Sequence, residues 1–203
     1  MSPNDGYRIL IDAFNQLGIE FYVGGSIASS FHGIPRGTRD VDIVAAILSE
    51  HIESLSEILS SDFYADPDLM RQSVALGRSF NLIHLATSYK FDIFPLKMDE
   101  FHKLQFARRQ PKDLTRAGLP GSGSFVASAE DTILEKLNWY RLGGGTSTNQ
   151  WNDILSVLDV QKAALDWDYL NRWASHLTVA DLLDRARSEA TPPRPPSPPR
   201  PLS

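Results

Sequence analysis

The N-terminal part of the chain alternates between segments with a helical hydrophobic period and short runs with the period of a strand. Apolar side chains recur at helical spacing from Tyr7 to Leu17, and Gly18 follows as a stop signal, so a helix is predicted there. Residues 20–23 form a short aromatic and β-branched run that ends at two glycines, which predicts a strand, a tight turn and a new helix capped by Ser26. Residues 40–44 read Asp-Val-Asp-Ile-Val, in which acidic and apolar side chains alternate over the first four positions. They predict a second strand with one acidic face.

The pattern further along the chain predicts a hairpin and then several helices. Residues 80–85 and 89–94 have the composition of strands, are joined by a short turn and end at Pro95. Helical spacing is found over residues 48–59, 129–142, 151–158, 167–177 and 179–186, and three glycines follow the second of these segments. The sequence therefore predicts an α+β fold, with a small mixed β-sheet and helices followed by a C-terminal helical bundle.

The predicted organisation has three parts. We expect an α/β core over residues 1–127, a helical subdomain over 128–190 and a disordered proline-rich tail over 191–203. An alternative for the tail is a polyproline ligand that binds an aromatic groove of a partner. The length of 203 residues suits one compact unit with a helical annex.

Composition and charge narrow the classes of function. The formal net charge is -5, so the chain lacks the global basic field of a general nucleic-acid or membrane binder. Cysteine is absent, which excludes disulfides, thiolate metal sites and cysteine nucleophiles. The N-terminus carries acid where a signal peptide needs base, and no apolar run has the length of a membrane span. We therefore expect a soluble cytoplasmic protein.

The sequence Asp40-Val41-Asp42 is the sharpest chemical feature. Two carboxylates at positions i and i+2 of a strand point to the same face, about 6.7 Å apart at their Cα atoms, and could hold hard cations such as Mg²⁺ between them. Aspartate is a poor strand former, so its use at both positions breaks a local rule and favours a site. The alternative is a solvated edge strand or an Asx turn.

Two further features could belong to the same site. Gly24, Gly25 and Ser26 lie between a predicted strand and a helix N-terminus, where backbone N–H groups suit a phosphate; the alternative is a plain tight turn. Asp92 is an acid within an apolar strand, and a buried carboxylate needs a partner. That partner could be a metal ion shared with the two earlier aspartates, or an ion pair with Lys90 or an arginine.

The order and spacing of these residues resemble the nucleotidyltransferase superfamily of the DNA polymerase β type. The resemblance covers residues 20–95: the Gly-Gly-Ser turn, thirteen residues, the Asp-x-Asp strand and a later strand aspartate. It implies that Gly24, Gly25 and Ser26 hold a nucleoside triphosphate. It also implies that Asp40, Asp42 and Asp92 are catalytic and bind two Mg²⁺ ions, with Asp92 assisting deprotonation of the attacking hydroxyl.

The helix predicted at 129–142 extends the resemblance to one group in particular. Lys136, Arg141 and Asp153 are similar to a Lys-Arg-Asp series in the AbiEii group, the nucleotidyltransferase-like toxins of type IV toxin-antitoxin systems. The resemblance implies nucleotide binding by Lys136 and Arg141. The two cations lie about 140° apart around a helix, so at most one points straight into a cleft, and the alternative is a solvated helix surface. Only one aspartate of the pair in that group is clear here, so the role of Asp153 stays open.

Other polar residues carry weaker signals. Arg36, Thr38 and Arg39 precede the acidic strand and could contact phosphate, although arginines in loops are usually solvated. Residues 97–116 hold six Lys or Arg against three Asp or Glu, which could steer RNA or a nucleotide, or could form a mixed charged surface. The histidines show no ligand spacing, and we interpret His32, His84 and His102 as structural.

The resemblance implies an enzyme that transfers a nucleoside monophosphate from a nucleoside triphosphate to an acceptor hydroxyl. The acceptor could be tRNA or a protein, with a cognate antitoxin as partner, if the toxin resemblance holds. Alternatives are a small-molecule nucleotidyltransferase of the antibiotic-modifying kind, a non-catalytic member of the fold that binds a nucleotide or partner protein, and a metal-dependent phosphodiesterase.

Overall fold

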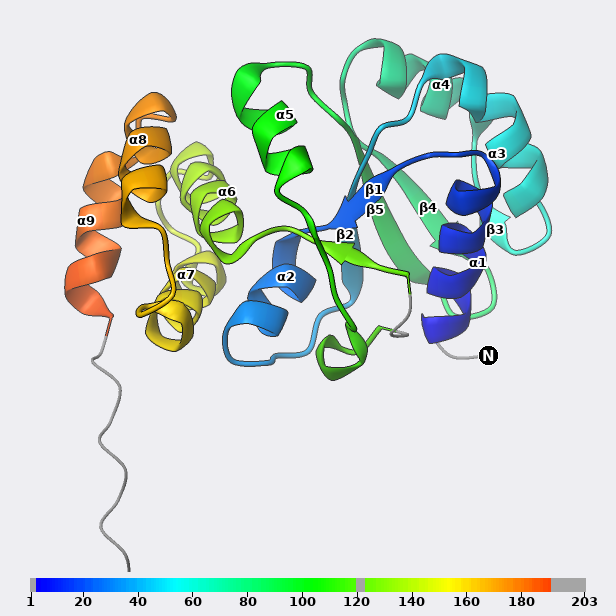
Figure 1. Ribbon diagram of the computed structural model, residues 1–203. Coiled ribbons are helices and arrows are strands. Elements are labelled where there is room, and N and C mark those ends of the chain that lie inside the picture. Colours follow the sequence, from blue (N-terminus) through cyan, green and yellow to red (C-terminus); the bar gives the residue numbers. More distant parts are fainter. Residues whose placement is uncertain (1–2, 120–122, 191–203) are drawn as a thin grey trace, which may run out of the picture.

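The computed structural model describes residues 3–119 and 123–190, and its centre is a seven-stranded mixed sheet (Figure 1). The strand order is β3-β4-β5-β2-β1-β7-β6. The pairs β2–β5 and β1–β7 are parallel, and the other neighbours are antiparallel. The strands are β1 (Phe21–Val23), β2 (Asp40–Ala45), β3 (Phe63–Tyr64), β4 (Phe80–His84), β5 (Tyr89–Pro95), β6 (Gln110–Pro111) and β7 (Phe125–Val126).

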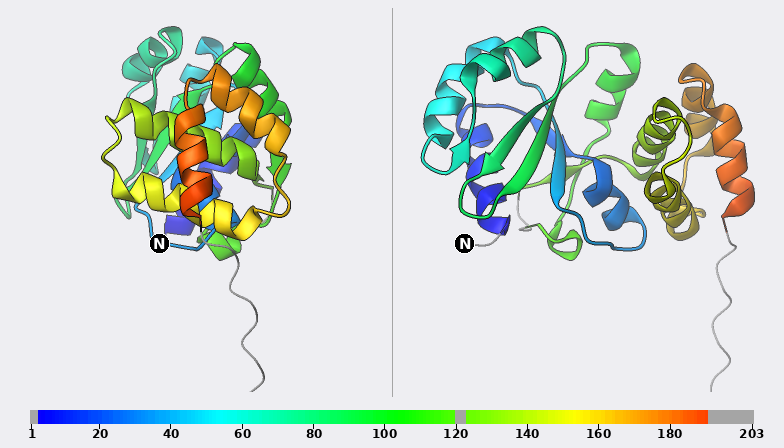
Figure 2. Two further views of the ribbon diagram at one scale, coloured as in Figure 1. Left: turned by 90° about the vertical axis from the view of Figure 1, so that its left-hand side faces the viewer. Right: turned by 180° about the vertical axis from the view of Figure 1, so that it is seen from behind.

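Helices cover the sheet and extend the molecule at one end. Helices α1, α3 and α4 lie on one side of the central strands, and α6 to α9 gather beyond α2 and α5 (Figures 1 and 2). The α-helices are α1 (Pro3–Gln16), α2 (Gly25–His32), α3 (Ile52–Leu59), α4 (Pro67–Ala75), α5 (Glu100–Ala107), α6 (Ala129–Leu142), α7 (Thr148–Gln161), α8 (Trp167–His176) and α9 (Ala180–Glu189). Short 3₁₀ turns, η1 (Ser49–His51) and η2 (Thr115–Ala117), complete the set in the described residues.

The predicted fold class is confirmed: a mixed sheet with helices precedes a group of C-terminal helices. The predicted hairpin is β4–β5, and α6 has the predicted bounds. The helix predicted from Leu48 instead begins as a 3₁₀ turn and becomes α-helical at Ile52. The tail predicted at 191–203 lies outside the described residues.

The prediction that Ser26 caps α2 is wrong. Helix α2 begins at Gly25 with Gly24 as its N-cap, and no side chain caps it. Ser26 therefore lies inside the first turn of the helix, where its hydroxyl is available to other partners.

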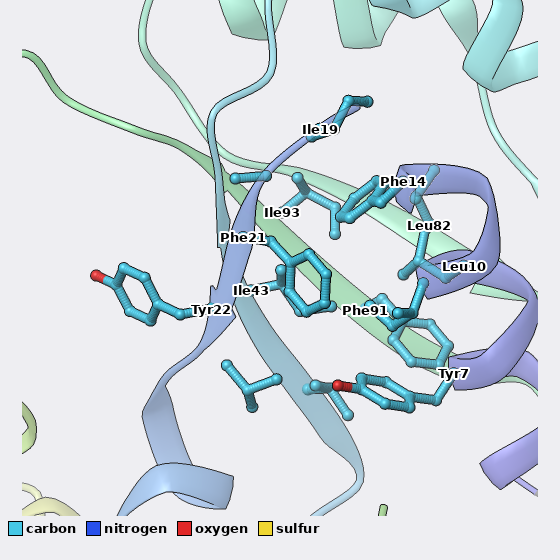
Figure 3. Packing of buried hydrophobic residues seen from close by; sticks show 14 of the residues in the cluster. Tyr7, Leu10, Phe14, Ile19, Phe21, Tyr22, Ile43, Leu82, Phe91 and Ile93 are labelled. Carbon is cyan, nitrogen blue, oxygen red and sulfur yellow. The ribbon is translucent and has the colours of Figure 1, made fainter. Parts of the chain in front are cut away.

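Two clusters of buried apolar side chains stabilise the fold. The first joins α1 to the sheet: the rings of Phe14 and Phe21 lie 5.7 Å apart, and Phe91 of β5 belongs to the same cluster (Figure 3). The second is formed by α6 to α9 together with Phe101 of α5. We keep the domain boundaries at 127/128 and 190/191 as a prediction. None of the helices in the two described stretches combines the length and apolarity that crossing a bilayer requires.

Alternation along β2 positions the acidic face. Val41, Ile43 and Ala45 are fully buried in the first cluster. Since successive side chains of a strand point to opposite faces, Asp40 and Asp42 project to the other side of the sheet.

Candidate functional site

The parallel pairing of β2 with β5 brings three aspartates to one face of the sheet. Asp42 is directly opposite Asp92 in the register, and Asp40 is opposite Lys90. Neighbouring strands lie about 4.8 Å apart, so the Asp42 and Asp92 side chains are close neighbours. The structure thus brings together the three carboxylates that the sequence singled out, while their catalytic roles stay a prediction.

Asp42 is the most perturbed of the three carboxylates. Burial raises its pKa from the ordinary 3.8 to about 6; the charges of Asp40 and Asp92 add to this effect, and Lys136 and Lys90 partly oppose it. Such a carboxylate is short of compensating positive charge. A cation bound beside Asp42 would supply it.

Gly25 provides the space that Asp42 occupies. Its φ is +53°, a region that favours glycine, and a Cβ placed there would lie 1.7 Å from Oδ2 of Asp42. In addition, the backbone N–H of Gly24 donates to the carbonyl oxygen of Asp42 at 2.9 Å. The turn and the acidic strand therefore fit against each other only with glycine at position 25.

The other two aspartates already have protein partners. The Thr38 hydroxyl donates to Oδ1 of Asp40 at 2.7 Å, and Nζ of Lys90 lies 2.7 Å from Oδ2 of Asp92. The ion pair with Lys90, one of the two alternatives for the partner of Asp92, is thus present. Within residues 3–119 and 123–190, no three His, Asp or Glu side chains are arranged to hold one metal ion. The all-oxygen donor set suits Mg²⁺ chemically, and Asp92 would join it only after releasing Lys90.

Arg36 connects the Gly-Gly-Ser turn to α7. Its Nη2 donates to the Ser26 hydroxyl at 2.8 Å. Its Nε and Nη2 also form a two-pronged ion pair with Oδ1 and Oδ2 of Asp153, at 2.6 and 2.7 Å. This loop arginine is not merely solvated, and it carries a fixed positive charge beside the turn.

Asp153 also binds Lys136, whose Nζ donates to Oδ2 at 2.8 Å. Burial favours a raised pKa for Asp153, but the hydrogen bond from Arg36 and the charge of Lys136 outweigh it and hold the pKa below its ordinary value. One carboxylate thus faces two cations, Arg36 and Lys136, next to the Gly-Gly-Ser turn and the N-terminus of α2. This arrangement suits an anion such as a phosphate group.

The structure does not bring Arg141 to this place. Arg141 is on an exposed part of α6 and forms an ion pair with Asp181 of α9, because it lies about 140° around the helix from the buried Lys136. Arg141 does not line the cleft that Lys136 lines, and the nucleotide contact of Arg141 stays a prediction. Arg36 is the residue that stands beside Lys136 instead. Arg39 is exposed in the loop before β2.

A cleft of about 370 Å³ lies over this region. The predicted residues that line it are Gly24, Gly25, Ser26, Asp40, Asp42 and Lys136. Asp92 and Thr38 lie next to lining residues: Asp92 is paired with Asp42 across the strands, and the Thr38 hydroxyl donates to Asp40. Its lining also includes residues that the sequence analysis did not single out as chemical, among them Tyr22, Phe94, Gln105, Glu135 and Trp139.

The remaining weak signals have mixed outcomes. The His32 ring forms a 2.7 Å hydrogen bond with the carbonyl oxygen of Ala127, and His84 is fully buried. Both positions agree with a structural role. His102, which we interpreted as structural, lines the cleft. In the basic stretch 97–116, the acids Glu130 and Glu20 pair with two arginines, so part of its charge is neutralised within the fold.

Comparison with known proteins gives similarity in structure only. No model of a known family matches the sequence, and no curated protein matches it. Among solved structures, ANT(2'')-Ia in complex with adenylyl-2''-tobramycin is similar at a TM-score of 0.56 and 11% identity, over 88% of this chain and 98% of that one. An antigenic nucleotidyltransferase-like protein from Paracoccidioides brasiliensis is similar at a TM-score of 0.55 and 17% identity, over 95% of both chains. The chain therefore shares the fold of these nucleotidyltransferases.

Proposed function

We propose that the protein is a metal-dependent nucleotidyltransferase, which moves a nucleoside monophosphate from a nucleoside triphosphate to an acceptor hydroxyl. One observation carries the proposal: a glycine turn, Lys136 and two aspartates, Asp40 and Asp42, line a single cleft. Arg36 is bonded to Ser26 of that turn, and Asp92 is paired with Asp42 on the neighbouring strand. The shared fold supports it. A solvated acidic strand would not require a glycine that makes room for one of its carboxylates.

The residues divide between binding and orientation. The backbone of Gly24 and Gly25, with Lys136 and Arg36, binds the β- and γ-phosphates, and Asp153 orients both cations. The acceptor oxygen then forms a bond to the α-phosphorus as the bond to the bridging oxygen breaks. Pyrophosphate leaves with that electron pair, and the hydroxyl proton passes to Asp92 once Lys90 has moved to the incoming phosphates.

Mg²⁺ is the cofactor that this donor set suits. Asp40 and Asp42, with Asp92 as the third ligand, would hold it, and two ions are expected. When bound, it would neutralise the phosphate oxygens and stabilise the charge of the leaving group. Its positive charge would also relieve the repulsion that raises the pKa of Asp42.

Two acceptor classes remain in the proposal. The resemblance to the AbiEii group favours tRNA or a protein side chain, with the chain acting as a toxin that a cognate antitoxin restrains. The fold shared with ANT(2'')-Ia favours a small hydroxylated molecule as the second candidate.

Transfer of label from α-³²P nucleoside triphosphates tests the proposal. Purified protein with Mg²⁺ is incubated with total tRNA, with total protein or with an aminoglycoside, and covalent label is followed on each acceptor. We expect label on one acceptor class, and loss of labelling by more than a hundredfold in Asp42→Asn, because the variant lacks an anionic ligand at the reacting phosphate.

The matched control is Asp12→Asn, which changes an exposed aspartate of α1 by the same chemistry. It should label at the wild-type rate. Release of free nucleoside monophosphate without covalent label would identify a phosphodiesterase instead. Equal labelling by Asp42→Asn and wild type would contradict a transferase at this site.

A further inference from the structure

A second polar network lines the cleft on the side of β1 and α5. We call it the α5 wall and define it by Tyr22, His102, Gln105 and Glu135. It is separate from the network around Asp153, because consecutive residues of a helix point about 100° apart. Accordingly, Lys136 contacts α7, while Glu135 contacts α5.

Hydrogen bonds fix the orientation of Gln105 within the wall. The hydroxyl of Tyr22 points away from the core around α1 (Figure 3) and donates to Oε1 of Gln105 at 2.9 Å. Since the amide oxygen is thus occupied, the amide NH₂ faces Glu135, and its Nε2 donates to Oε1 of that residue at 3.4 Å. Gln105 is 1% exposed, so it has few alternative positions.

His102 lies near the same oxygen of Glu135. Its Nδ1 lies 2.7 Å from a carboxylate oxygen of Asp99, which places its Nε2 3.7 Å from Oε1 of Glu135. Within the described chain, the hydrogen bonds and ion pairs of Glu135 all use Oε1. The second oxygen, Oε2, is left for a ligand in the cleft.

Few hydrogen-bond donors and positive charges offset the desolvation of the Glu135 carboxylate. Burial raises its pKa; the charge of His102, the bond from Gln105 and the more distant Lys97 oppose this, and Asp131 adds to it. A carboxylate in this position gains from each further hydrogen-bond donor that a ligand brings.

A flat aromatic surface adjoins Glu135. Trp139 lies four residues further along α6, so the two side chains share one face of the helix. The indole is half exposed, and its ring centre lies 6.4 Å from that of Phe94, which also lines the cleft. Aromatic side chains of this kind stack with nucleobases.

We propose that the α5 wall binds the nucleobase of the triphosphate and selects bases with an exocyclic amino group. Oε2 of Glu135 accepts a hydrogen bond from that group while the base stacks on Trp139. Adenine, guanine and cytosine carry such a donor on C6, C2 and C4 respectively, whereas both exocyclic groups of uracil are carbonyl oxygens, which a carboxylate repels. The inference rests on the proposed function, because it takes the triphosphate to be bound at the Gly-Gly-Ser turn of the same cleft.

Calorimetric titration of the full chain with non-hydrolysable analogues of ATP, GTP, CTP and UTP, in the presence of Mg²⁺, tests this. The readout is the ratio of the UTP-analogue Kd to the Kd of each amino-bearing analogue. We expect a ratio of about 10 or more in the wild type, and a fall of about tenfold in Glu135→Gln, because its amide can also donate to uracil. Loss of the Glu135 charge also changes the affinity for the triphosphate group, but this change is the same for all four analogues and cancels in the ratio.

Three further variants complete the design. Glu135→Asp keeps the charge but shortens the reach, so it should also lower the ratio. Trp139→Ala should weaken all four analogues by about fivefold or more and keep the ratio. Glu57→Gln, at an exposed position of α3, should change neither quantity.

The outcomes separate the two proposals. A wild-type ratio near 1, or a ratio that both Glu135 variants leave unchanged, would overturn base selection by Glu135. Failure of all four analogues to bind the wild type would instead overturn the proposed function. Loss of all four in Lys136→Ala, with normal selectivity in Glu57→Gln, is the result expected if the phosphates bind at the turn.

Discussion

Replacing Asp42 by asparagine should stabilise the protein at neutral pH in the absence of divalent cations. In the folded chain the carboxyl of Asp42 is buried near Asp40 and Asp92, and its pKa is raised from 3.8 to about 6. The proton therefore binds the folded state more tightly than the unfolded one. This rise corresponds to about 3 kcal/mol, the free energy that folding must supply to keep the carboxylate charged at high pH.

The sign of the pH dependence follows from this direction. Well below pH 3.8 the carboxyl is protonated in both states, so its ionisation costs nothing. As the pH rises through about 6, the folded carboxyl loses its proton and the cost reaches its full size. The stability advantage of Asp42→Asn should therefore grow by up to about 3 kcal/mol between pH 4 and pH 8, which is a difference of about 6–12 °C in Tm for a domain of this size.

Urea unfolding followed by tryptophan fluorescence, with EDTA present, measures this difference at both pH values. Asp12→Asn serves as the control, because the side chain of Asp12 is exposed on α1. Its free energy of unfolding should differ from that of the wild type by the same amount at pH 4 and pH 8. Addition of Mg²⁺ with ATP at about 100 times its Kd should then stabilise the wild type by about 2.7 kcal/mol and leave Asp42→Asn unchanged. An advantage for Asp42→Asn that is equal at both pH values, or that shrinks toward pH 8, would refute the electrostatic reasoning.

Three other substitutions test the surroundings of the site. Asp153→Asn should weaken triphosphate binding by about 10- to 100-fold, because the two cations that it orients lose their anionic partner; calorimetry measures this, and an unchanged Kd would contradict its positioning role. Gly25→Ala should destabilise the fold by about 2 kcal/mol or more, since its Cβ would overlap Asp42 at a positive φ; a wild-type Tm would show that the turn can move away. Tyr169→Phe should cost about 1–3 kcal/mol in urea unfolding, because it removes the 2.6 Å hydrogen bond to the fully buried Asp131, and a smaller loss would imply that another donor replaces it.

Local periodicity was sufficient to predict the parts of the site that lie within one element. The alternation of residues 40–44 places two aspartates on one face of a strand whatever that strand packs against. The composition of residues 80–94 predicted the β4–β5 hairpin for the same reason, because a short turn leaves few ways to pair the two runs. Asp92 was recognised because an acid within an apolar strand needs a partner, and the parallel register puts it opposite Asp42.

The tertiary structure decided which cations stand at the site. The helical period shows that Lys136 and Arg141 face different ways, but it does not show which of them faces the cleft. Packing of α6 on α7 buries Lys136 against Asp153 and leaves Arg141 exposed with Asp181. The second cation is Arg36, whose partner Asp153 is 117 residues away along the chain.

The α5 wall was also beyond the reach of the sequence alone. His102 has no ligand spacing, Gln105 and Glu135 are ordinary residues of amphipathic helices, and Tyr22 reads as one more apolar strand residue. Their chemistry arises only because β1, α5 and α6 meet at one cleft and orient the polar side chains toward one carboxylate. Periodicity within an element determines which face a side chain occupies, whereas the packing of elements distant in the sequence determines what that face meets.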